Sequence, residues 1–296
     1  MARYPEDVDR WRRAARIASE ARDFGAARAV PGASRRELAD RIEARIRDLG
    51  AEPAFPANLS RNVEAAHYTP SVDDEERLEA GDVLKVDIGA HLDGAIADTA
   101  VTVEVGGGHV HERLIRASRE ALEAGIAVVR PGVAIDDISR AIESAIHRHG
   151  FKPIENLTGH TIEPYVLHAG TSIPNAQGMS SGHLEEGQVV AIEPFATNGF
   201  GQIANGPFGN IVRFREDPGA GDPEVARLFG RFKTLPFTAR HVPASERPAL
   251  ARVRRRLQNY PVFVEVGGGL VSQAEHTLLV VPGGAEVLTA PVGKPS

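Results

Sequence analysis

The alternation of apolar and polar positions is most regular in residues 82–105, where two β-prone runs meet at the dipeptide Asp93-Gly94. Asp-Gly is favoured in the two-residue loop of a β-hairpin, so these residues are predicted to form the turn. In that register Gly89 pairs with Asp98, and Asp87 lies on the same face as Asp98, diagonally across the ladder. Side chains in that relation are roughly 7–8 Å apart, within reach of a shared cation. The alternative is a solvated hairpin face that carries two ordinary acidic residues.

Amphipathic periodicity predicts two helices before this hairpin and two after it. Ser34 followed by Glu37 has the spacing of a capping box at the start of the second helix. The predicted helices are Pro5–Phe24, Pro31–Gly50, His109–Val129 and Pro131–Gly150. Residues 51–70 contain three prolines and are predicted to be extended and rich in loops.

The second half of the chain repeats part of the first. The helical segment Pro31–Gly50 recurs 100 residues later with the same apolar positions, and LEAGDVLKVD (78–87) is echoed by LEEGQVVAIE (184–193). Asp87 of the first half therefore corresponds to Glu193 of the second. Helix and strand recur in the same order, which predicts two halves related by a pseudo-twofold axis, each supplying a carboxylate to a site between them. A period of this length excludes a solenoid.

The repeat is interrupted in the second half. The pattern becomes helical over residues 216–260, with helix starts at Asp222-Pro223 and at Pro243–Ser245. The second of these helices is predicted to continue through Leu257. These signals predict a helical insertion within a single domain that spans residues 1–296. β-Patterning resumes after the insertion, and Glu275 falls just before a final strand.

Composition narrows the classes of function. The chain has 296 residues, of which 42% are apolar, with a net charge of −6 and no cysteine. It is long enough for a large core, and any metal must be held by histidine and carboxylate side chains, because disulfide and thiolate chemistry are excluded. The first residues lack an apolar signal core, and no apolar run reaches membrane-spanning length. We therefore expect a cytoplasmic protein without a membrane partner.

One basic run, ARVRRRL at residues 251–257, raises RNA binding as an alternative function. The chain as a whole has no basic excess, and charge runs on helices are usually solvated faces. Nucleic acid is therefore not expected as a partner.

Five residues have the chemistry of a metal site. They are Asp87, Asp98, His160, Glu193 and Glu275. Four carboxylates and one imidazole form an oxygen-rich set, which suits a pair of first-row divalent ions better than structural zinc. Two such ions bridged by carboxylates and a hydroxide are a standard hydrolytic device. A lone histidine is more often structural than a ligand. No role is therefore given to His91, His109, His111, His147, His149, His183, His241 and His276.

Several stretches together resemble the type II methionine aminopeptidases, most of all the archaeal form. The resemblance runs over nearly the whole chain, and its motifs are specific in combination. They are AAHYTP (65–70), KVDIGAHLDGAIADTAVTV (85–103), GHTIEPYVLHAG (159–170), AIEPFAT (191–197) and QAEHT (273–277). The resemblance implies an α/β (α+β) pita-bread fold with pseudo-twofold related halves and a helical insertion in the second half, in agreement with the internal repeat.

The resemblance also implies roles for individual residues. The five residues above become the metal ligands, with Asp98 and Glu275 as the bridging pair and Glu193 as a ligand that also shuttles the proton. His67 and His168 match two histidines that line the substrate site without holding metal. The residues that match the methionine pocket are Phe55, Leu167, Phe195 and Tyr260. The alternative for these four side chains is simple core packing.

The implied reaction is removal of the N-terminal methionine from nascent proteins and peptides with a small second residue. Hydrolysis by a water or hydroxide that bridges two divalent ions is implied, and Co, Mn, Fe and Zn all tolerate such ligands. The expected partners are the N-terminal peptides of nascent proteins, with the enzyme a monomer close to the ribosome.

Two other functions share this fold. One is an X-Pro aminopeptidase or prolidase-like dimetal peptidase, and the other is a binding protein that has lost its metal ligands. The predicted insertion and the GHTIEPYVLHAG stretch argue against the first of these, and the complete set of five ligands argues against the second.

Overall fold

The structure is a computed structural model that describes residues 4–207, 209–219 and 221–290. The helices are α1 (Val8–Ala26), α2 (Arg35–Asp48), α3 (Glu112–Val128), α4 (Ile135–Arg148), α5 (Pro223–Phe232) and α6 (Pro248–Val253), with the 3-10 turns η1 (Ala239–His241) and η2 (Arg254–Arg256). Within the described residues no helix combines the length and the apolar character needed to cross a bilayer.

The strands are short except for three of ten residues each, β1, β3 and β4. Those of the first half are β1 (Glu52–Arg61), β2 (Glu64–Ala66), β3 (Val83–Leu92) and β4 (Ala95–Glu104). Those that follow are β5 (Lys152–Pro153), β6 (Thr158–Ile162), β7 (Ser172–Pro174), β8 (Val189–Ile192), β9 (Phe195–Thr197), β10 (Ile203–Asn205) and β11 (Ile211–Phe214). The last are β12 (Phe237–Thr238), β13 (Leu257–Tyr260), β14 (Phe263–Glu265), β15 (Val271–Gln273), β16 (His276–Val281) and β17 (Gly284–Val287).

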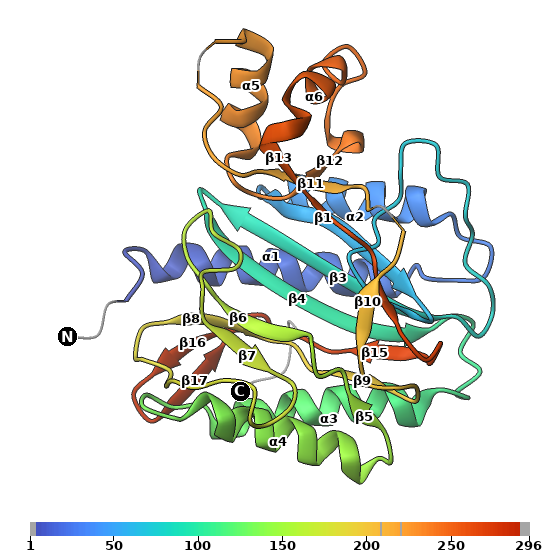
Figure 1. Cartoon of the computed structure of the whole chain (residues 1–296), viewed down its shortest axis with the longest axis vertical. Coiled ribbons are helices and arrows are strands. Elements are labelled where there is room, and N and C mark those ends of the chain that lie inside the picture. Colours follow the sequence, from blue (N-terminus) through green and yellow to red (C-terminus); the bar gives the residue numbers. More distant parts are fainter. Residues whose placement is uncertain (1–3, 208, 220, 291–296) are drawn as a thin grey trace.

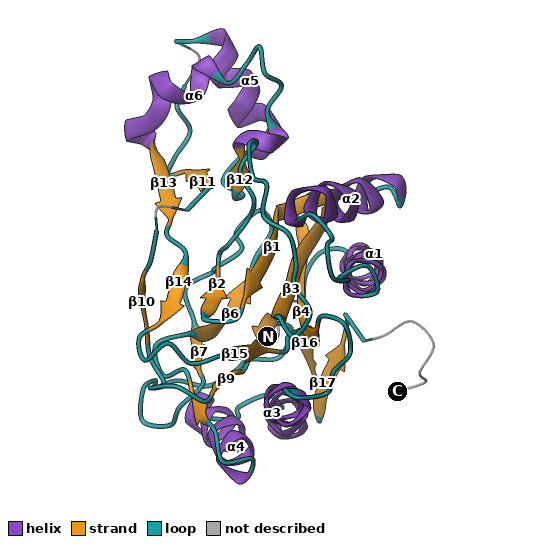
Figure 2. Ribbon diagram, turned by 90° about the vertical axis from the view of Figure 1, so that its right-hand side faces the viewer, coloured by secondary structure: helices purple, strands orange, loops and turns teal. Residues whose placement is uncertain are grey.

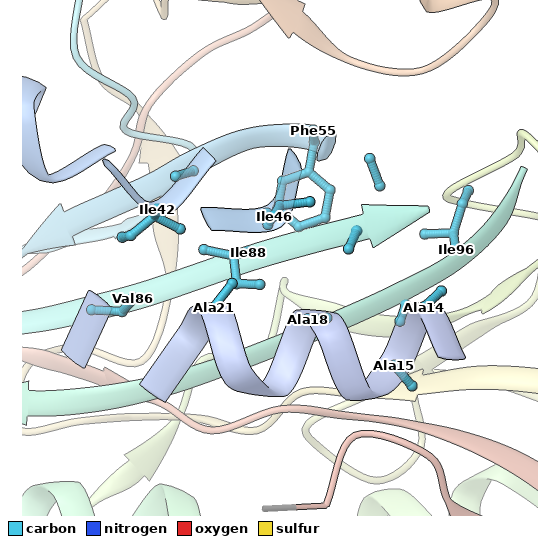
Figure 3. Close-up of a cluster of buried hydrophobic side chains, with 14 of the residues drawn as sticks. Ala14, Ala15, Ala18, Ala21, Ile42, Ile46, Phe55, Val86, Ile88 and Ile96 are labelled. Carbon is cyan, nitrogen blue, oxygen red and sulfur yellow. The ribbon is translucent and has the colours of Figure 1, made fainter. Parts of the chain in front are cut away.

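Two helix pairs lie on the outer side of the strands, which confirms the α/β pita-bread architecture (Figures 1 and 2). Helices α1 and α2 cover the sheet of order β1-β3-β4, and α3 and α4 cover strands of the second half, whose largest sheet has the order β17-β16-β8-β6-β7. In the first half, the alanine-rich face of α1 packs close to Val86 and Ile88 of β3, with Ile42 and Ile46 of α2 in the same cluster (Figure 3).

The predicted hairpin is present in the predicted register. Leu92 pairs with Ala95 and Gly89 with Asp98. Both turn residues have positive φ, 46° at Asp93 and 89° at Gly94, as a type I′ turn requires. Asp87 and Asp98 therefore lie on one face, turned away from the core of α1.

The two halves repeat in their packing as well as in their sequence. A Cβ added at Gly25 would meet Ile42, and one added at Gly125 would meet Ile142. The turns before α2 and α4 each make an equivalent backbone hydrogen bond to the segment that precedes a strand. Gly32 N donates to Leu78 O before β3, and Gly132 N donates to Leu184 O before β8, each at 2.7 Å. The helices repeat at an offset of 100 residues and the strands at 106, as the sequence pattern predicts.

The segment at residues 51–70 is more regular than predicted. Half of it is β1, which pairs with β3 along the hairpin. Pro53 and Pro56 lie at the two register shifts of this pairing, on an edge strand of the sheet. Proline is tolerated there because bulges and edges do not need every backbone N–H for the ladder. The prediction of loops from these prolines is therefore wrong for β1, because Pro53 and Pro56 mark bulges in a strand.

Residues 216–260 hold α5 and α6, which project from the body above β1 (Figure 2). The helix start at Asp222 is confirmed, because its side chain accepts hydrogen bonds from the first helical N–H groups. The prediction of a helix from Pro243 to Leu257 is wrong. The helix begins only at Pro248, since proline fits the first turn but not a helix interior, and Leu257 belongs to β13. A three-stranded sheet of order β12-β11-β13 accompanies the helices.

Candidate active site

A cavity of about 240 Å³ lies between the two halves and below the insertion. All eleven side chains that the sequence analysis singled out line it. They are Phe55, His67, Asp87, Asp98, His160, Leu167, His168, Glu193, Phe195, Tyr260 and Glu275. The structure thus brings together residues that are up to 220 positions apart in the chain, from Phe55 to Glu275.

The five candidate ligands come from five adjacent strands or strand ends. Asp87 lies on β3, Asp98 on β4 and His160 on β6, while Glu193 follows β8 and Glu275 precedes β16. The two halves are joined at this point by a bridge between Ala100 and Glu275, whose backbone N–H groups each donate to the carbonyl of the other residue. Thr277 adds a second tie, because its hydroxyl both accepts from Asp98 N and donates to Asp98 O, each at 2.8 Å. The sheets therefore fix the distance between the backbones that carry the Asp98 and Glu275 carboxylates.

The side chains converge closely enough to share ions. His160 Nε2 is 3.7 Å from Asp98 Oδ2 and 3.5 Å from Glu193 Oε1. One donor atom each from Asp98, His160 and Glu275 lies within 4.8 Å of the others, and all three residues are buried. Asp87 completes the group from the position next to Asp98 on the hairpin face.

Burial and mutual repulsion dominate the electrostatics of the site. Burial raises the pKa of Asp87 to about 7, although hydrogen bonds from Asn58 and Gln273 oppose the shift. Burial, and then the charges of the neighbouring carboxylates, hold the pKa of Asp98, Glu193 and Glu275 well above the usual range. Buried carboxylates this close together cannot all ionise without a compensating positive charge.

The residues present fit a site for divalent cations. Among the described residues, Asp87 Oδ1, Asp98 Oδ1 and Glu275 Oε1 are buried and have no hydrogen-bond partner. Buried carboxylate oxygens of this kind are paired or bind metal in native proteins. Burial, with the nearby His168, lowers the pKa of His160 well below its usual value, which keeps the ring in the neutral form that metals require.

Two amides that the sequence analysis did not identify hold these carboxylates in place. Asn58 on β1 is opposite Asp87 and donates to Asp87 Oδ2 at 3.3 Å, and Gln273 donates to Glu275 Oε2 at 3.3 Å. Each amide leaves one carboxylate oxygen free to face the cavity. Gln273 is part of the QAEHT motif, so its spacing from Glu275 was a usable signal.

His67 and His168 lie together beside the metal-ligand cluster. The His168 ring is 4.3 Å from that of His160, centroid to centroid, and is exposed to the cavity. His67 packs against Tyr260 and Phe263, with centroid distances of 5.4 and 4.5 Å, and has a positive φ of 66°. Such backbone strain is concentrated at functional sites. Burial, and then the nearby His168, lower the pKa of His67 to about 4, so its ring is neutral at pH 7.

The rest of the cavity wall is mainly apolar, with Asn156 and Thr158 as its polar members. Phe55, Leu167 and Phe195 are buried, and Tyr260 is half-buried at the base of the insertion. Further wall residues that sequence reasoning missed are Ala66, Asn156, Leu157, Thr158, Ile211, Pro236 and Phe263. The cavity therefore combines an apolar wall with a carboxylate cluster, separated by a pair of neutral histidines.

Comparison with known proteins places this site in a family. Residues 9–221 match the model described as metallopeptidase family M24. A methionine aminopeptidase of Archaeoglobus fulgidus is 46% identical over 283 residues, covering 93% of this chain and 96% of the relative. One from Pyrococcus horikoshii is 45% identical over 295 residues, covering 96% and 99%. The crystal structure of a methionine aminopeptidase from Thermotoga maritima shares the fold, with a TM-score of 0.73 at 24% identity and coverage of 98% and 99%.

The fold and the buried cluster of carboxylates and histidine define a peptidase that depends on divalent metal ions. The chain belongs to metallopeptidase family M24 and, within that family, to the methionine aminopeptidases.

Proposed function

We propose that this protein removes the N-terminal methionine from peptides and nascent proteins whose second residue is small, and that it uses two divalent metal ions. The observation that carries the proposal is that five potential metal ligands and a mainly apolar wall line one cavity of about 240 Å³. The relatives that cover almost the whole chain carry the name methionine aminopeptidase, which supports the same activity.

The proposed ligands are Asp87, Asp98, His160, Glu193 and Glu275, with Asp98 and Glu275 as the bridging pair. When bound, the cations would supply Lewis-acid activation of the scissile carbonyl and of the attacking water. Co, Mn, Fe and Zn all suit this set of oxygen and nitrogen donors.

The remaining steps belong to side chains of this chain. Glu193 would transfer the proton from the attacking water to the leaving amine. Its buried carboxyl has a raised pKa and lies 3.5 Å from His160 Nε2. His67 Nδ1 is buried without a hydrogen-bond partner among the described residues, so it is available to the scissile peptide. His168 lies across from it and would stabilise charge that develops on the carbonyl oxygen.

The apolar wall accounts for the choice of methionine. Phe55, Leu167, Phe195 and Tyr260 offer an unbranched, polarisable side chain a surface of aromatic and aliphatic groups. The rings of His67, Tyr260 and Phe263 pack together. A scissile bond placed beside His67 would leave little space for the second side chain. This crowding supports the proposed preference for small second residues.

We further propose that the enzyme works as a monomer in the cytoplasm on chains that emerge from the ribosome. Its partners would then be the N-terminal peptides of nascent proteins, with no membrane or nucleic-acid partner.

A panel of peptides tests the proposed function. The cation-loaded protein should release methionine from Met-Ala-Ser, release it far more slowly from Met-Leu-Ser, and leave Leu-Ala-Ser and Ala-Pro-Ser intact. Cleavage of Ala-Pro-Ser in preference to Met-Ala-Ser would assign the site to X-Pro peptides. No cleavage of any peptide with metal bound would favour a binding protein.

A further inference from the structure

The loop between β6 and β7 carries Leu167 and His168, two residues of the cavity wall. It has no strand of its own to hold it. Glu163 and Val166 are bonded to each other in both directions, at 3.0 and 2.8 Å, so Pro164 and Tyr165 form the middle of a tight turn. Because this turn lies directly before Leu167, its placement decides where the two wall residues lie.

Tyr165 adopts an unfavourable backbone conformation in this turn. Its φ is +60°, in the left-handed region that glycine and asparagine adopt easily and that a tyrosine avoids. Proline followed by a residue with positive φ is the pattern of a type II turn, where glycine is the usual second residue. A tyrosine at this position indicates that contacts of the ring or the backbone compensate for the strain.

Those contacts join three parts of the active site. Tyr165 N donates to Gly94 O at 3.0 Å, which ties the loop to the turn of the hairpin that carries Asp87 and Asp98. Tyr165 O accepts from Thr234 Oγ1 at 2.8 Å, which ties the loop to the insertion, two residues before Pro236 of the cavity wall. Both backbone polar groups of Tyr165 therefore bond to other segments.

The ring of Tyr165 fits against the hairpin turn. A Cβ added at Gly94 would lie 2.5 Å from Tyr165 Cε2, so only glycine leaves space for the ring there. The ring also makes an edge contact with His91, at 5.8 Å between centroids, and packs against the buried cluster that includes Leu167 and Leu235. The Asp93-Gly94 turn thus closes the hairpin and also forms the surface against which the Tyr165 ring packs.

We propose that Tyr165 is a positioning residue that latches the β6–β7 loop to the hairpin turn and to the insertion, and thereby sets the positions of Leu167 and His168. This inference rests on the proposed function, because it assigns the latch to the methionine pocket and to the histidine beside the scissile bond. The part of the side chain that acts is the ring, since the contacts with Gly94 and His91 are made by ring atoms.

Four variants distinguish the effect of the Tyr165 ring contacts from the effect of the backbone strain at this residue. Tyr165→Phe keeps the ring, Tyr165→Gly removes it while relieving the backbone strain, and Thr234→Val removes only the bond from the insertion. Asp93→Asn is the matched control at the same turn, because asparagine tolerates the φ of 46° at that position. Each variant is measured for kcat and KM on Met-Ala-Ser, for bound metal, and for amide hydrogen exchange in residues 163–171.

Tyr165→Gly should raise KM and lower kcat/KM by about 10- to 100-fold, as expected for misplaced substrate contacts. Its bound metal should stay at the wild-type level, and exchange in residues 163–171 should become faster. Tyr165→Phe and Asp93→Asn should stay within about twofold of the wild type. If Tyr165→Gly does not fold, Thr234→Val carries the test, with an expected loss of about three- to tenfold in kcat/KM for one hydrogen bond.

For Tyr165→Gly, either a kcat/KM within twofold of the wild type or unchanged exchange in residues 163–171 would overturn the proposed positioning role of Tyr165. The exchange measurement needs no activity. If the wild-type protein releases no methionine, the proposed function fails, and the exchange of the loop in Tyr165→Gly still decides whether the latch exists.

Discussion

At the scale of single residues, the site separates side chains suited to holding cations from side chains suited to holding the peptide. Asp98 and Glu275 are buried, and each has an oxygen without a hydrogen-bond partner among the described residues. His67 is half-buried among aromatic rings, and its buried Nδ1 likewise has no partner there. A neutral imidazole next to the five proposed metal ligands is suited to hydrogen bonding with a substrate. The role of His67 is therefore the most informative one to test.

Replacing His67 by alanine should leave the metal sites filled and the fold intact while turnover drops. Loss of one contact to developing charge in a site that excludes water typically costs about 10²–10³ in kcat. Steady-state kinetics on Met-Ala-Ser, with metal analysis of the same sample, check this. Loss of one metal equivalent would make His67 a ligand, and near-normal turnover would assign it to packing.

The sequence predicts those parts of the site that depend on residues close together in the chain, and it misses those that depend on distant pairings. Asp87 and Asp98 were placed on one face by the Asp93-Gly94 turn alone, because a two-residue loop fixes the register of the whole hairpin. Asn58 was missed because its role depends on the pairing of β1 with β3, and the prolines of β1 concealed a strand. The strained turn at Tyr165 has no signal in the sequence beyond the preceding proline.

At the scale of elements, one buried ion network holds the insertion against the body. Glu43 of α2 accepts a hydrogen bond from Arg240 at 2.8 Å and lies 3.0 Å from His241 Nε2, both in or next to η1. Arg240 also donates to Thr69 Oγ1 and to Pro70 O. The insertion supplies Tyr260 and Pro236 to the cavity, so this network connects the stability of α2 to the shape of the site.

The stability of the protein should depend on Glu43 in a manner set by pH. Burial alone would raise the pKa of Glu43, but His241 and Arg240 outweigh it and lower the pKa from 4.5 to about 2. A carboxylate with a lowered folded-state pKa contributes stability that is fully present above the unfolded value of 4.5 and is lost as the pH falls towards 2. A shift of this size corresponds to about 3 kcal/mol.

Glu43→Gln should therefore lower the free energy of unfolding by about 3 kcal/mol at pH 7, because it also leaves Arg240 without its buried partner. The difference from wild type should shrink to about half near pH 3.3. Urea unfolding between pH 7 and pH 3 measures it. Glu143→Gln is the matched control from the repeated helix, where the carboxylate accepts one bond from Gln177 N, and about 1 kcal/mol or less is expected. Equal losses in both variants would show that the network adds nothing.

The helices and the hairpin followed from sequence, and the sheet of the insertion did not. Four amphipathic helices carry an apolar stripe with the helical period, which needs no tertiary information. Strands β11, β12 and β13 are two to four residues long and pair across the insertion, so no local period reveals them. The helix predicted at Pro243 failed because a second proline, Pro248, begins the actual helix.

At the scale of the whole molecule, the internal repeat explains why the site lies where it does. Asp87 and Glu193 occupy equivalent positions in the two halves, and both point into the space between them. The insertion has no counterpart in the first half, and it adds a third wall to this shared cavity. The repeat was visible in the sequence because helix and strand recur in the same order, whereas the shape of the cavity depends on contacts between the halves.

The equivalence of the halves can be tested at two glycines. A Cβ at Gly25 would lie 2.5 Å from Ile42 Cδ1, whereas one at Gly125 would lie 3.0 Å from Ile142 Cγ1. Overpacking costs about 1–3 kcal/mol, and alanine gains about 1 kcal/mol over glycine within a helix. Gly25→Ala should therefore be destabilising by about 1 kcal/mol or more, and Gly125→Ala nearly neutral, by chemical denaturation. The opposite order would mean that the first half packs more loosely than the structure indicates.

In the proposed function, the buried cluster of carboxylates and histidine uses divalent cations to release N-terminal methionine. The most direct test starts with protein stripped of metal and follows release of methionine from Met-Ala-Ser while Co²⁺ or Mn²⁺ is added. The rate should start near zero, rise with the amount of cation bound and then level off, and Asp98→Asn should bind less cation and remain inactive. Release of methionine at an undiminished rate by the metal-free protein would contradict the proposed dependence on divalent cations.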